Sequence, residues 1–289
     1  MRKIVSTHLF VQQRLHAGLL DLLVEAGAEG VELFCAKQSF DYTDPVQVRM
    51  AAEWFASSPA QLHSLHSPIY YDELWGRSGE PQVNIAARQP RERLRAMEEV
   101  QRALEIADKL PFRYLVQHIG ASNEEWDQAK ADAALTSLER LRVLAKQSGV
   151  QILVENIPNG LSQPQRLIQF LEQSHMDDIG ICFDSGHAQM TEGWMGGGGA
   201  LPSWEHLGGR VLSTHLHDNH GQADEHLWPG QGAVAWDQLM PLVQASGAPC
   251  LLEVRQPAGS TNPVEEIRRA FAYLESCAQG TEKMRNANS

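Results

Sequence analysis

The stretch TSLERLRVLAKQSGVQILVENIP, residues 136–158, contains the unit that decides the fold of this chain. Its first half belongs to an amphipathic segment, 124–147, of the kind that forms a surface helix. Gly149 follows at the point where such a helix needs a left-handed residue in order to stop. The apolar run QILVENIP at 151–158 then predicts a buried strand. Helix, glycine and strand in this order indicate one unit of a parallel sheet.

The same alternation recurs along the whole chain. Eight short apolar runs are separated by longer amphipathic segments, and eight parallel strands close into a barrel. We therefore expect an α/β protein with a single (β/α)8 TIM barrel over residues 1–278 and a polar C-terminal tail over 279–289. The runs expected as strands are KIVSTHLF (3–10), GVELFC (30–35), QLHSLHSP (61–68), YLVQHIG (114–120), QILVENIP (151–158), IGICFDSGH (179–187), VLSTHLHD (211–218) and PCLLEVRQ (249–256).

The segments between these runs give further expectations. A second surface helix is expected over 90–109, because apolar residues recur there three and four positions apart. Gly247 stands, like Gly149, where a helix must stop. The face of the 90–109 helix expected to be buried comprises Leu94, Met97, Val100, Leu104 and Ala107.

Two connections depart from the regular pattern. They cover residues 69–86 after the third run and 189–209 after the sixth, the latter with four consecutive glycines at 196–199. Both follow the carboxyl ends of strands, where a barrel of this type has its active site. They are candidates for lids or substrate walls, or alternatively insertions without a role in function.

Composition excludes several classes of protein. The chain has 289 residues and no run of eighteen apolar residues, so we expect one cytoplasmic domain without a membrane span. Its four cysteines are far apart in sequence and show no Cys-x-x-Cys spacing, which argues against a disulfide framework or a zinc knuckle. The formal net charge of −12 disfavours nonspecific binding to nucleic acid or to anionic membranes.

Metal-ligand side chains stand at the ends of the third to eighth runs. Any one of them is explained equally well by ordinary hydrogen bonding, but six successive strands ending in this way indicate a divalent-metal site. Glu155 in ILVEN and Glu253 in CLLEV are flanked by apolar residues, where a carboxylate needs a cation or a partner such as Arg255. The strand-end residues are His66, His118, Glu155, Asp184, His187, His215 and Glu253.

The segment THLHDNHGQADEHLWPGQG, 214–232, concentrates further candidates. Strand alternation places His215 and His217 on the same face of the barrel. Asp224 and His226 could hold a second ion, or could decorate a solvated loop. Mixed imidazole and carboxylate ligands suit Zn²⁺, Mn²⁺, Co²⁺ or Fe²⁺ better than Ca²⁺. No dinucleotide fingerprint, Walker motif or nucleophile elbow occurs, so nicotinamide, nucleotide and serine-hydrolase chemistry lack support.

Taken together, these motifs resemble the xylose isomerase-like barrels, a family that includes sugar phosphate isomerases and epimerases together with endonuclease IV. The resemblance spans nearly the whole chain. It rests on GVELF at 30–34, HSP at 66–68, HIG at 118–120, VENIPNG at 154–160, FDSGHA at 183–188, THLHDN at 214–219, DEHLWPGQG at 224–232 and LLEV at 251–254.

In the isomerase branch the resemblance implies one divalent ion, Mn, Zn, Co, Mg or Fe, held by Glu155, Asp184, His215 and Glu253. Glu155 and Glu253 would then transfer a proton through an enediolate of a sugar, a sugar phosphate or an inositol derivative. Contacts to the substrate are expected from His66 and His187, from His217 and Arg255, and from aromatic walls at Trp75, Trp194 or Trp228.

In the endonuclease IV branch the resemblance implies a trinuclear zinc site that hydrolyses a phosphodiester at abasic DNA. The nine corresponding residues are His66, His118, Glu155, Asp184, His187, His215, Asp224, His226 and Glu253. Five of them, His66, His118, His187, Asp224 and His226, would surround the inner four and could hold either further ions or the sugar.

The distribution of basic residues favours the isomerase branch over the endonuclease IV branch. Gripping a polyanion requires basic loops, yet 177–205 and 211–240 contain no Lys or Arg; Arg77 is an exception elsewhere. We therefore expect a small polyhydroxylated substrate rather than nucleic acid. A non-catalytic binding barrel is a third possibility, because a fold does not establish an activity. A homo-oligomer is possible, although no decisive surface patch stands out.

Overall fold

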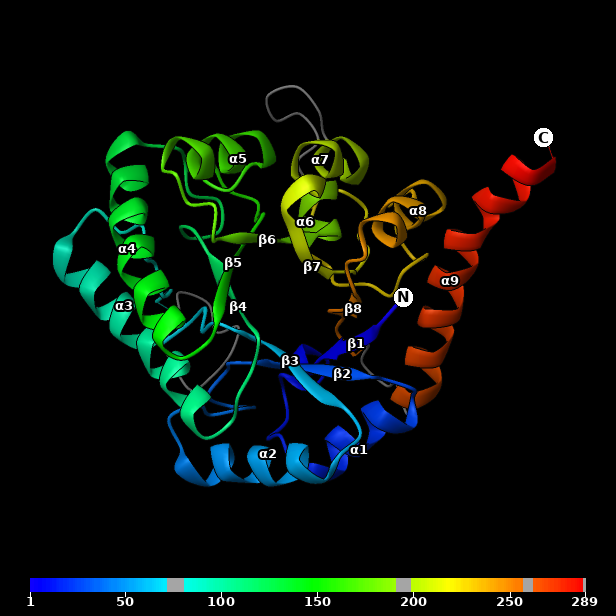
Figure 1. The fold of residues 1–289 in the computed structure, drawn as a ribbon, viewed down its shortest axis with the longest axis horizontal. Coiled ribbons are helices and arrows are strands. Elements are labelled where there is room, and N and C mark those ends of the chain that lie inside the picture. The colour runs from blue at the N-terminus through cyan, green and yellow to red at the C-terminus, as the bar shows by residue number, and fades with distance from the viewer. Residues whose placement is uncertain (72–80, 191–198, 257–261, 288–289) are drawn as a thin grey trace.

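The structure, a computed structural model, describes residues 1–71, 81–190, 199–256 and 262–287, with side chains up to residue 280. Eight parallel strands form its centre, in the order β7-β6-β5-β4-β3-β2-β1-β8 (Figure 1). A parallel bridge between Leu216 and Leu252 joins the two ends of this order, so the sheet closes into a TIM barrel as expected. The strands are β1 (Lys3–Ser6), β2 (Gly30–Phe34), β3 (Gln61–His66), β4 (Tyr114–His118), β5 (Gln151–Glu155), β6 (Gly180–Asp184), β7 (Val211–His215) and β8 (Cys250–Leu252).

Helices surround the strands on the outside of the barrel (Figure 1). Several begin at a proline, whose fixed φ and missing N–H suit the first turn. Gly149 and Gly247, with φ of 71° and 77°, adopt the left-handed conformation that was predicted after the fourth and eighth helices. The helices are α1 (Ala17–Glu25), α2 (Pro45–Ser57), α3 (Pro90–Glu105), α4 (Gln128–Gln147), α5 (Pro164–Gln173), α6 (Ser185–Gln189), α7 (Ala200–Leu207), α8 (Trp236–Ser246) and α9 (Pro263–Ala287).

The strands are shorter than the apolar runs that predicted them. The first run leaves the sheet after Ser6, because the Ser6 hydroxyl accepts the His8 N–H and starts a 3-10 helix over Thr7–Phe10. The sixth run ends at Asp184, whose carboxylate accepts the His187 N–H and caps α6. In both places a backbone N–H donates to a polar side chain instead of continuing the hydrogen bonding of the sheet.

Helix boundaries and faces also differ in part from expectation. Helix α4 begins at Gln128 rather than at residue 124, since Asp127 caps it by accepting the Lys130 N–H. In the 90–109 segment α3 ends at Glu105 and a short 3-10 helix follows over Ile106–Asp108. Leu94 is 46% exposed, so it is not on the buried face as predicted; Ala96 and Ala103 complete that face instead. The other four predicted residues are buried.

The two irregular connections are described in part. Of the 69–86 connection, the structure describes all but residues 72–80. Of the 189–209 connection, it describes all but residues 191–198, and this part contains α7. Trp75, Arg77, Trp194 and the first three glycines of the 196–199 run therefore lie outside the described residues. Helix α9 continues through most of the segment for which we expected a tail. Among the described helices, none combines the length and apolar character that crossing a membrane requires.

The barrel interior is built in layers. Val116, Leu153 and Cys182 pack together with Tyr114 as a small apolar cluster. Because side chains alternate along a strand, the residues two positions further on face the same interior. Those residues are polar: they are His118, Glu155 and Asp184, and they form the layer above the apolar cluster.

Candidate metal centre

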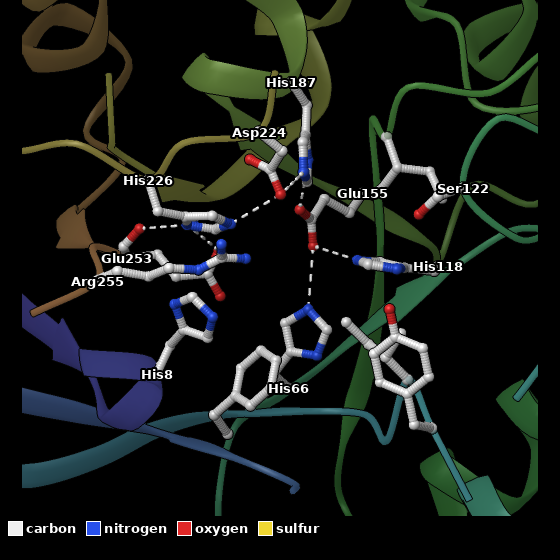
Figure 2. Close-up of a pocket in the computed structure, with 14 residues that line it drawn as sticks. His8, His66, His118, Ser122, Glu155, His187, Asp224, His226, Glu253 and Arg255 are labelled. Atoms are coloured by element: carbon white, nitrogen blue, oxygen red, sulfur yellow. Dashed lines mark hydrogen bonds and ion pairs between the residues drawn. The ribbon is translucent and has the colours of Figure 1, made fainter. Parts of the chain in front are cut away.

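Polar side chains from six strand ends converge on one pocket at the carboxyl end of the barrel (Figure 2). The empty volume of this pocket is about 500 Å³. Phe34, Ile69 and Ile157 supply apolar wall, whereas Ser122 and Arg255 contribute further polar groups. The position agrees with that of active sites in barrels of this type.

The central group is Glu155, Asp184, His215 and Glu253. Their ligand atoms all lie within 4.8 Å of one another, and each residue is at most 2% exposed. His215 Nδ1 lies 3.3 Å from Glu155 Oε2 and 3.5 Å from Glu253 Oε2. Within the described ranges, neither Glu155 nor Glu253 forms an ion pair with Lys or Arg, so Arg255 does not neutralise Glu253. A bound cation would stabilise three carboxylates buried this close to one another.

A second group adjoins the first through Glu155. His66 Nε2 lies 3.4 Å and His118 Nε2 lies 3.2 Å from the same oxygen, Glu155 Oε2. The ligand atoms of these three residues also lie within 4.8 Å of one another. Glu155 therefore belongs to two candidate ion sites at once.

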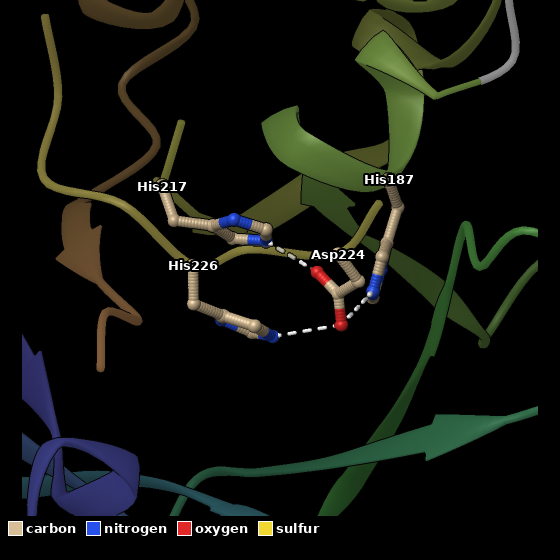
Figure 3. Close-up of side chains that lie close together, drawn as sticks. All are labelled: His187, His217, Asp224 and His226. Atoms are coloured by element: carbon tan, nitrogen blue, oxygen red, sulfur yellow. Dashed lines mark hydrogen bonds and ion pairs between the residues drawn. The ribbon is translucent and has the colours of Figure 1, made fainter. Parts of the chain in front are cut away.

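A third group comprises His187, His217, Asp224 and His226. Figure 3 shows Asp224 between His187 on one side and His217 and His226 on the other. The Asp224 carboxylate lies 3.0 Å from His226 Nε2, 3.7 Å from His187 Nε2 and 3.9 Å from His217 Nε2. His217, expected to contact substrate, is instead fully buried here and stacks on His226 at 4.0 Å between ring centroids.

Two histidines are oriented as metal ligands by backbone carbonyls. His66 Nδ1 lies 2.8 Å from the Ser67 oxygen, and His226 Nδ1 lies 2.8 Å from the Glu253 oxygen. A carbonyl oxygen can only accept, so both Nδ1 atoms carry the proton and both Nε2 atoms keep a lone pair. Those lone pairs face Glu155 and Asp224, which is the pattern by which proteins fix a metal-binding histidine.

The pKa values of the two glutamates of the central group are shifted in opposite directions. Burial raises the pKa of Glu253 well above its usual value. Burial also opposes ionisation of Glu155, but the charges of His215 and His118 outweigh it and hold the Glu155 pKa well below its usual value. Glu155 Oε1, Glu253 Oε1 and His215 Nδ1 are buried without a hydrogen-bond partner. Buried polar atoms of this kind require an explanation, and a shared cation supplies one.

The donor set fits a divalent ion. Imidazole nitrogens and carboxylate oxygens together suit Zn²⁺, Mn²⁺, Co²⁺ or Fe²⁺, and one such atom from each of the four central residues lies within 4.8 Å of the others. These buried groups of His, Asp and Glu could therefore hold a metal.

Comparison with known proteins bears on this geometry. Residues 20–277 match the family model of the xylose isomerase-like TIM barrel. The chain belongs to this family. An uncharacterized protein of Sinorhizobium fredii is 23% identical over 242 residues, covering 78% of this chain and 76% of its own. The crystal structure of a D-tagatose 3-epimerase-like protein superimposes with a TM-score of 0.77 at 21% identity, covering 98% and 99% of the two chains. The crystal structure of an IOLI protein with a binding zinc atom superimposes with a TM-score of 0.70 at 16% identity, covering 97% of this chain and 99% of that chain.

Within this family barrel, the nine residues suggested by sequence all meet at the strand ends, in three adjoining groups. Arg255 lines the pocket, whereas Trp228 is buried in the main apolar core, away from the described lining. Two residues in contact with these groups were not predicted. His8 lines the pocket with its ring 4.5 Å from that of His226, and Glu32 contacts His215 from β2. A charged residue inside the apolar run GVELF was the available signal for Glu32.

Gly186 is required by the close approach of α6 to the third group. A Cβ at this position would overlap the His217 imidazole ring. Gly186→Ala is therefore expected to displace His217 and to lower the free energy of unfolding by about 1–3 kcal/mol. Gly209→Ala is the matched control, since a Cβ there meets no atom within 4 Å. Urea denaturation of both variants measures the difference, and equal stability of the two would contradict the described packing.

Proposed function

We propose that this protein is a divalent-metal-dependent isomerase or epimerase of a sugar, sugar phosphate or inositol derivative. The observation that carries the proposal is the central group, in which two glutamates of opposite pKa shift share one imidazole at the floor of an open pocket. Resemblance in fold to a D-tagatose 3-epimerase-like protein supports a small polyhydroxylated substrate.

Glu155, Asp184, His215 and Glu253 would hold the ion. When bound, it supplies Lewis acidity that stabilises negative charge on the substrate carbonyl oxygen. One glutamate removes the proton from the carbon next to the carbonyl, and the electron pair forms the C=C bond of an enediolate. Return of a proton to that carbon from the other glutamate completes an epimerisation, while return to the neighbouring carbon completes an isomerisation. Glu155 ends β5 and Glu253 follows β8, so they approach the pocket from separate parts of the barrel.

The remaining pocket residues would bind and orient the substrate. Arg255 is exposed and its side chain lines the pocket, so it is placed to donate to a substrate oxygen (Figure 2). His66, His118 and His187 line the same space and could donate to hydroxyls wherever they are not ligands. We assign His217 to the third group rather than to the substrate, because it stacks on His226 and is not among the residues that line the pocket.

Deuterium exchange tests the proposal. The protein, loaded with Mn²⁺, Co²⁺ or Zn²⁺, is incubated in deuterated water with a panel of ketoses, ketose phosphates and inosose-type ketones. We expect deuterium at the carbon next to the carbonyl of the competent substrate, and loss of both exchange and turnover on chelation. Turnover without exchange would contradict proton transfer and favour a hydride shift.

A second candidate function follows from one specific observation: all nine residues that the endonuclease IV resemblance requires are present in three adjoining groups. A three-ion phosphodiesterase would use a bridging hydroxide as its nucleophile. Metal analysis together with a nicking assay on a duplex containing an abasic site discriminates between the two. Three ions per chain with nicking would overturn the isomerase proposal.

The absence of Lys and Arg from 177–205 and 211–240 favours the isomerase. Any chelator-sensitive turnover would exclude a purely binding barrel.

A further inference from the structure

Glu32 is a buried carboxylate that the proposed proton transfer does not use. It lies on β2 and is 0% exposed. In the described part of the chain its charged contact is His215, whose Nε2 lies 3.1 Å from Glu32 Oε1. Glu32 Oε2 accepts a hydrogen bond of 2.7 Å from the Ser64 hydroxyl. A carboxylate removed from water in this way is costly unless its partners compensate for the lost solvation.

The contact determines how His215 presents its ring. A carboxylate that already accepts from Ser64 acts as an acceptor, so His215 Nε2 carries the proton that it shares with Glu32. In the neutral ring that a metal ion requires, the other nitrogen, Nδ1, then keeps its lone pair. That atom lies 3.3 Å from Glu155, 3.5 Å from Glu253 and 3.9 Å from Asp184, and it has no hydrogen-bond partner. The imidazole thus spans from Glu32 on one side to the three carboxylates on the other.

We propose that Glu32 is the positioning residue of the central metal group, and that it holds His215 in the tautomer and orientation that give Nδ1 to the ion. The inference rests on the metal site of the proposed function but not on the reaction catalysed there. His66 and His226 are held by neutral carbonyls, whereas His215 is held by a charged group. An anionic partner also increases the basicity of the ligand nitrogen, so His215 becomes the strongest imidazole donor among these three.

Two alternative roles for Glu32 make different predictions. If Glu32 only fills and links the barrel interior, its replacement lowers the stability of the metal-free protein and leaves metal affinity unchanged. If Glu32 positions His215, replacement lowers metal affinity even where the metal-free fold remains intact. Measurements of metal binding and of metal-free stability therefore separate the two roles.

The experiment compares Glu32→Gln, Glu32→Ala and the control Glu99→Gln. Gln keeps an oxygen that can accept from His215 but removes the charge, and Ala removes both. Glu99 is also a buried glutamate, 4% exposed, but it lies on α3 and pairs with Lys37 at 2.9 Å. Zn²⁺ affinity is measured by chelator competition, Co²⁺ binding by its visible absorption spectrum, and metal-free stability by urea denaturation. Asp224→Asn identifies the spectral signal of the third group, so that a change can be assigned to the central one.

We expect Glu32→Ala to weaken Zn²⁺ binding by about 100-fold and Glu32→Gln by about 10-fold, the range found for partners of metal-binding histidines. The Co²⁺ spectrum of the central group should change in both variants, with partial rescue by Gln. Glu99→Gln should lose stability only. Unchanged Zn²⁺ affinity in Glu32→Gln would overturn the inference and leave the proposed function standing. Weakened affinity in a protein that exchanges no substrate proton would support the inference and overturn the function.

Discussion

Glu155→Gln and Glu253→Gln are each expected to lower kcat by about 10²–10⁴-fold, the usual contribution of a positioned general acid or base. Each change removes a group that takes or returns a proton, and each also removes one negative charge from the group that holds the ion. The effect should be larger for Glu155, because its carboxylate lies within 3.4 Å of four histidines, whereas that of Glu253 lies 3.5 and 3.9 Å from two. Steady-state kinetics at saturating Mn²⁺ or Co²⁺ measure the loss.

The half-buried Glu225 offers a matched control in the loop that follows β7. It hydrogen-bonds His220 rather than any member of the three groups, so Glu225→Gln should retain activity. Ion content must be measured in parallel, because a variant that has lost its ion cannot report on proton transfer. Full activity in either Glu155→Gln or Glu253→Gln, with the ion present, would show that the assigned pair is wrong.

Asp218→Ala is expected to cost about 3 kcal/mol of unfolding free energy, because each buried donor left without an acceptor costs about 1–3 kcal/mol before the loop relaxes. Asp218 is fully buried and accepts from Gly230 N at 2.9 Å, Val234 N at 3.1 Å and Trp236 Nε1 at 2.8 Å. Truncation would leave these donors buried without an acceptor. Urea denaturation of the metal-free protein measures the loss.

Asp177→Ala provides the comparison for Asp218. The Asp177 side chain is 90% exposed and pairs with Arg210 at the surface, so its removal should change stability by less than about 1 kcal/mol. A loss for Asp218→Ala no greater than that for Asp177→Ala would show that the described hydrogen bonds contribute nothing. Asp218 and Asp224 thus have different tasks within one His- and Asp-rich segment: the first secures the loop, and the second faces the candidate ligands.

The barrel and the meeting of the seven strand-end residues could be predicted from the sequence because both depend on local patterns. Alternation of apolar runs with amphipathic segments indicates strands and helices, and a parallel barrel gathers all strand ends at one rim. Strand lengths were overestimated, since the apolar runs continue into segments where Ser6 and Asp184 bind the backbone instead. Leu94 was misplaced because small alanines can complete a helix face as well as leucines can.

A charged residue inside the apolar run GVELF marks Glu32 in the sequence, but its contact with His215 could not be predicted from local patterns. Its partner His215 is 183 positions away, and no spacing rule links the two. The division of the ligands into three groups could not be predicted from local patterns either. Chain order suggests one collection of His, Asp and Glu, whereas the separation into adjoining groups depends on where β3 to β8 bring their ends in space.

The concentration of buried carboxylates at one rim would make the stability of the barrel depend on metal supply once these groups hold the proposed ion. Glu32, Glu155, Asp184 and Glu253 are all removed from solvent, and they repel one another. An ion that binds the folded chain but not the unfolded one adds RT ln(1 + [M]/Kd), about 2.7 kcal/mol at a free concentration 100 times Kd. A low concentration of the ion would thus lower the amount of folded protein as well as its activity. The chains that unfold would then be degraded by proteases.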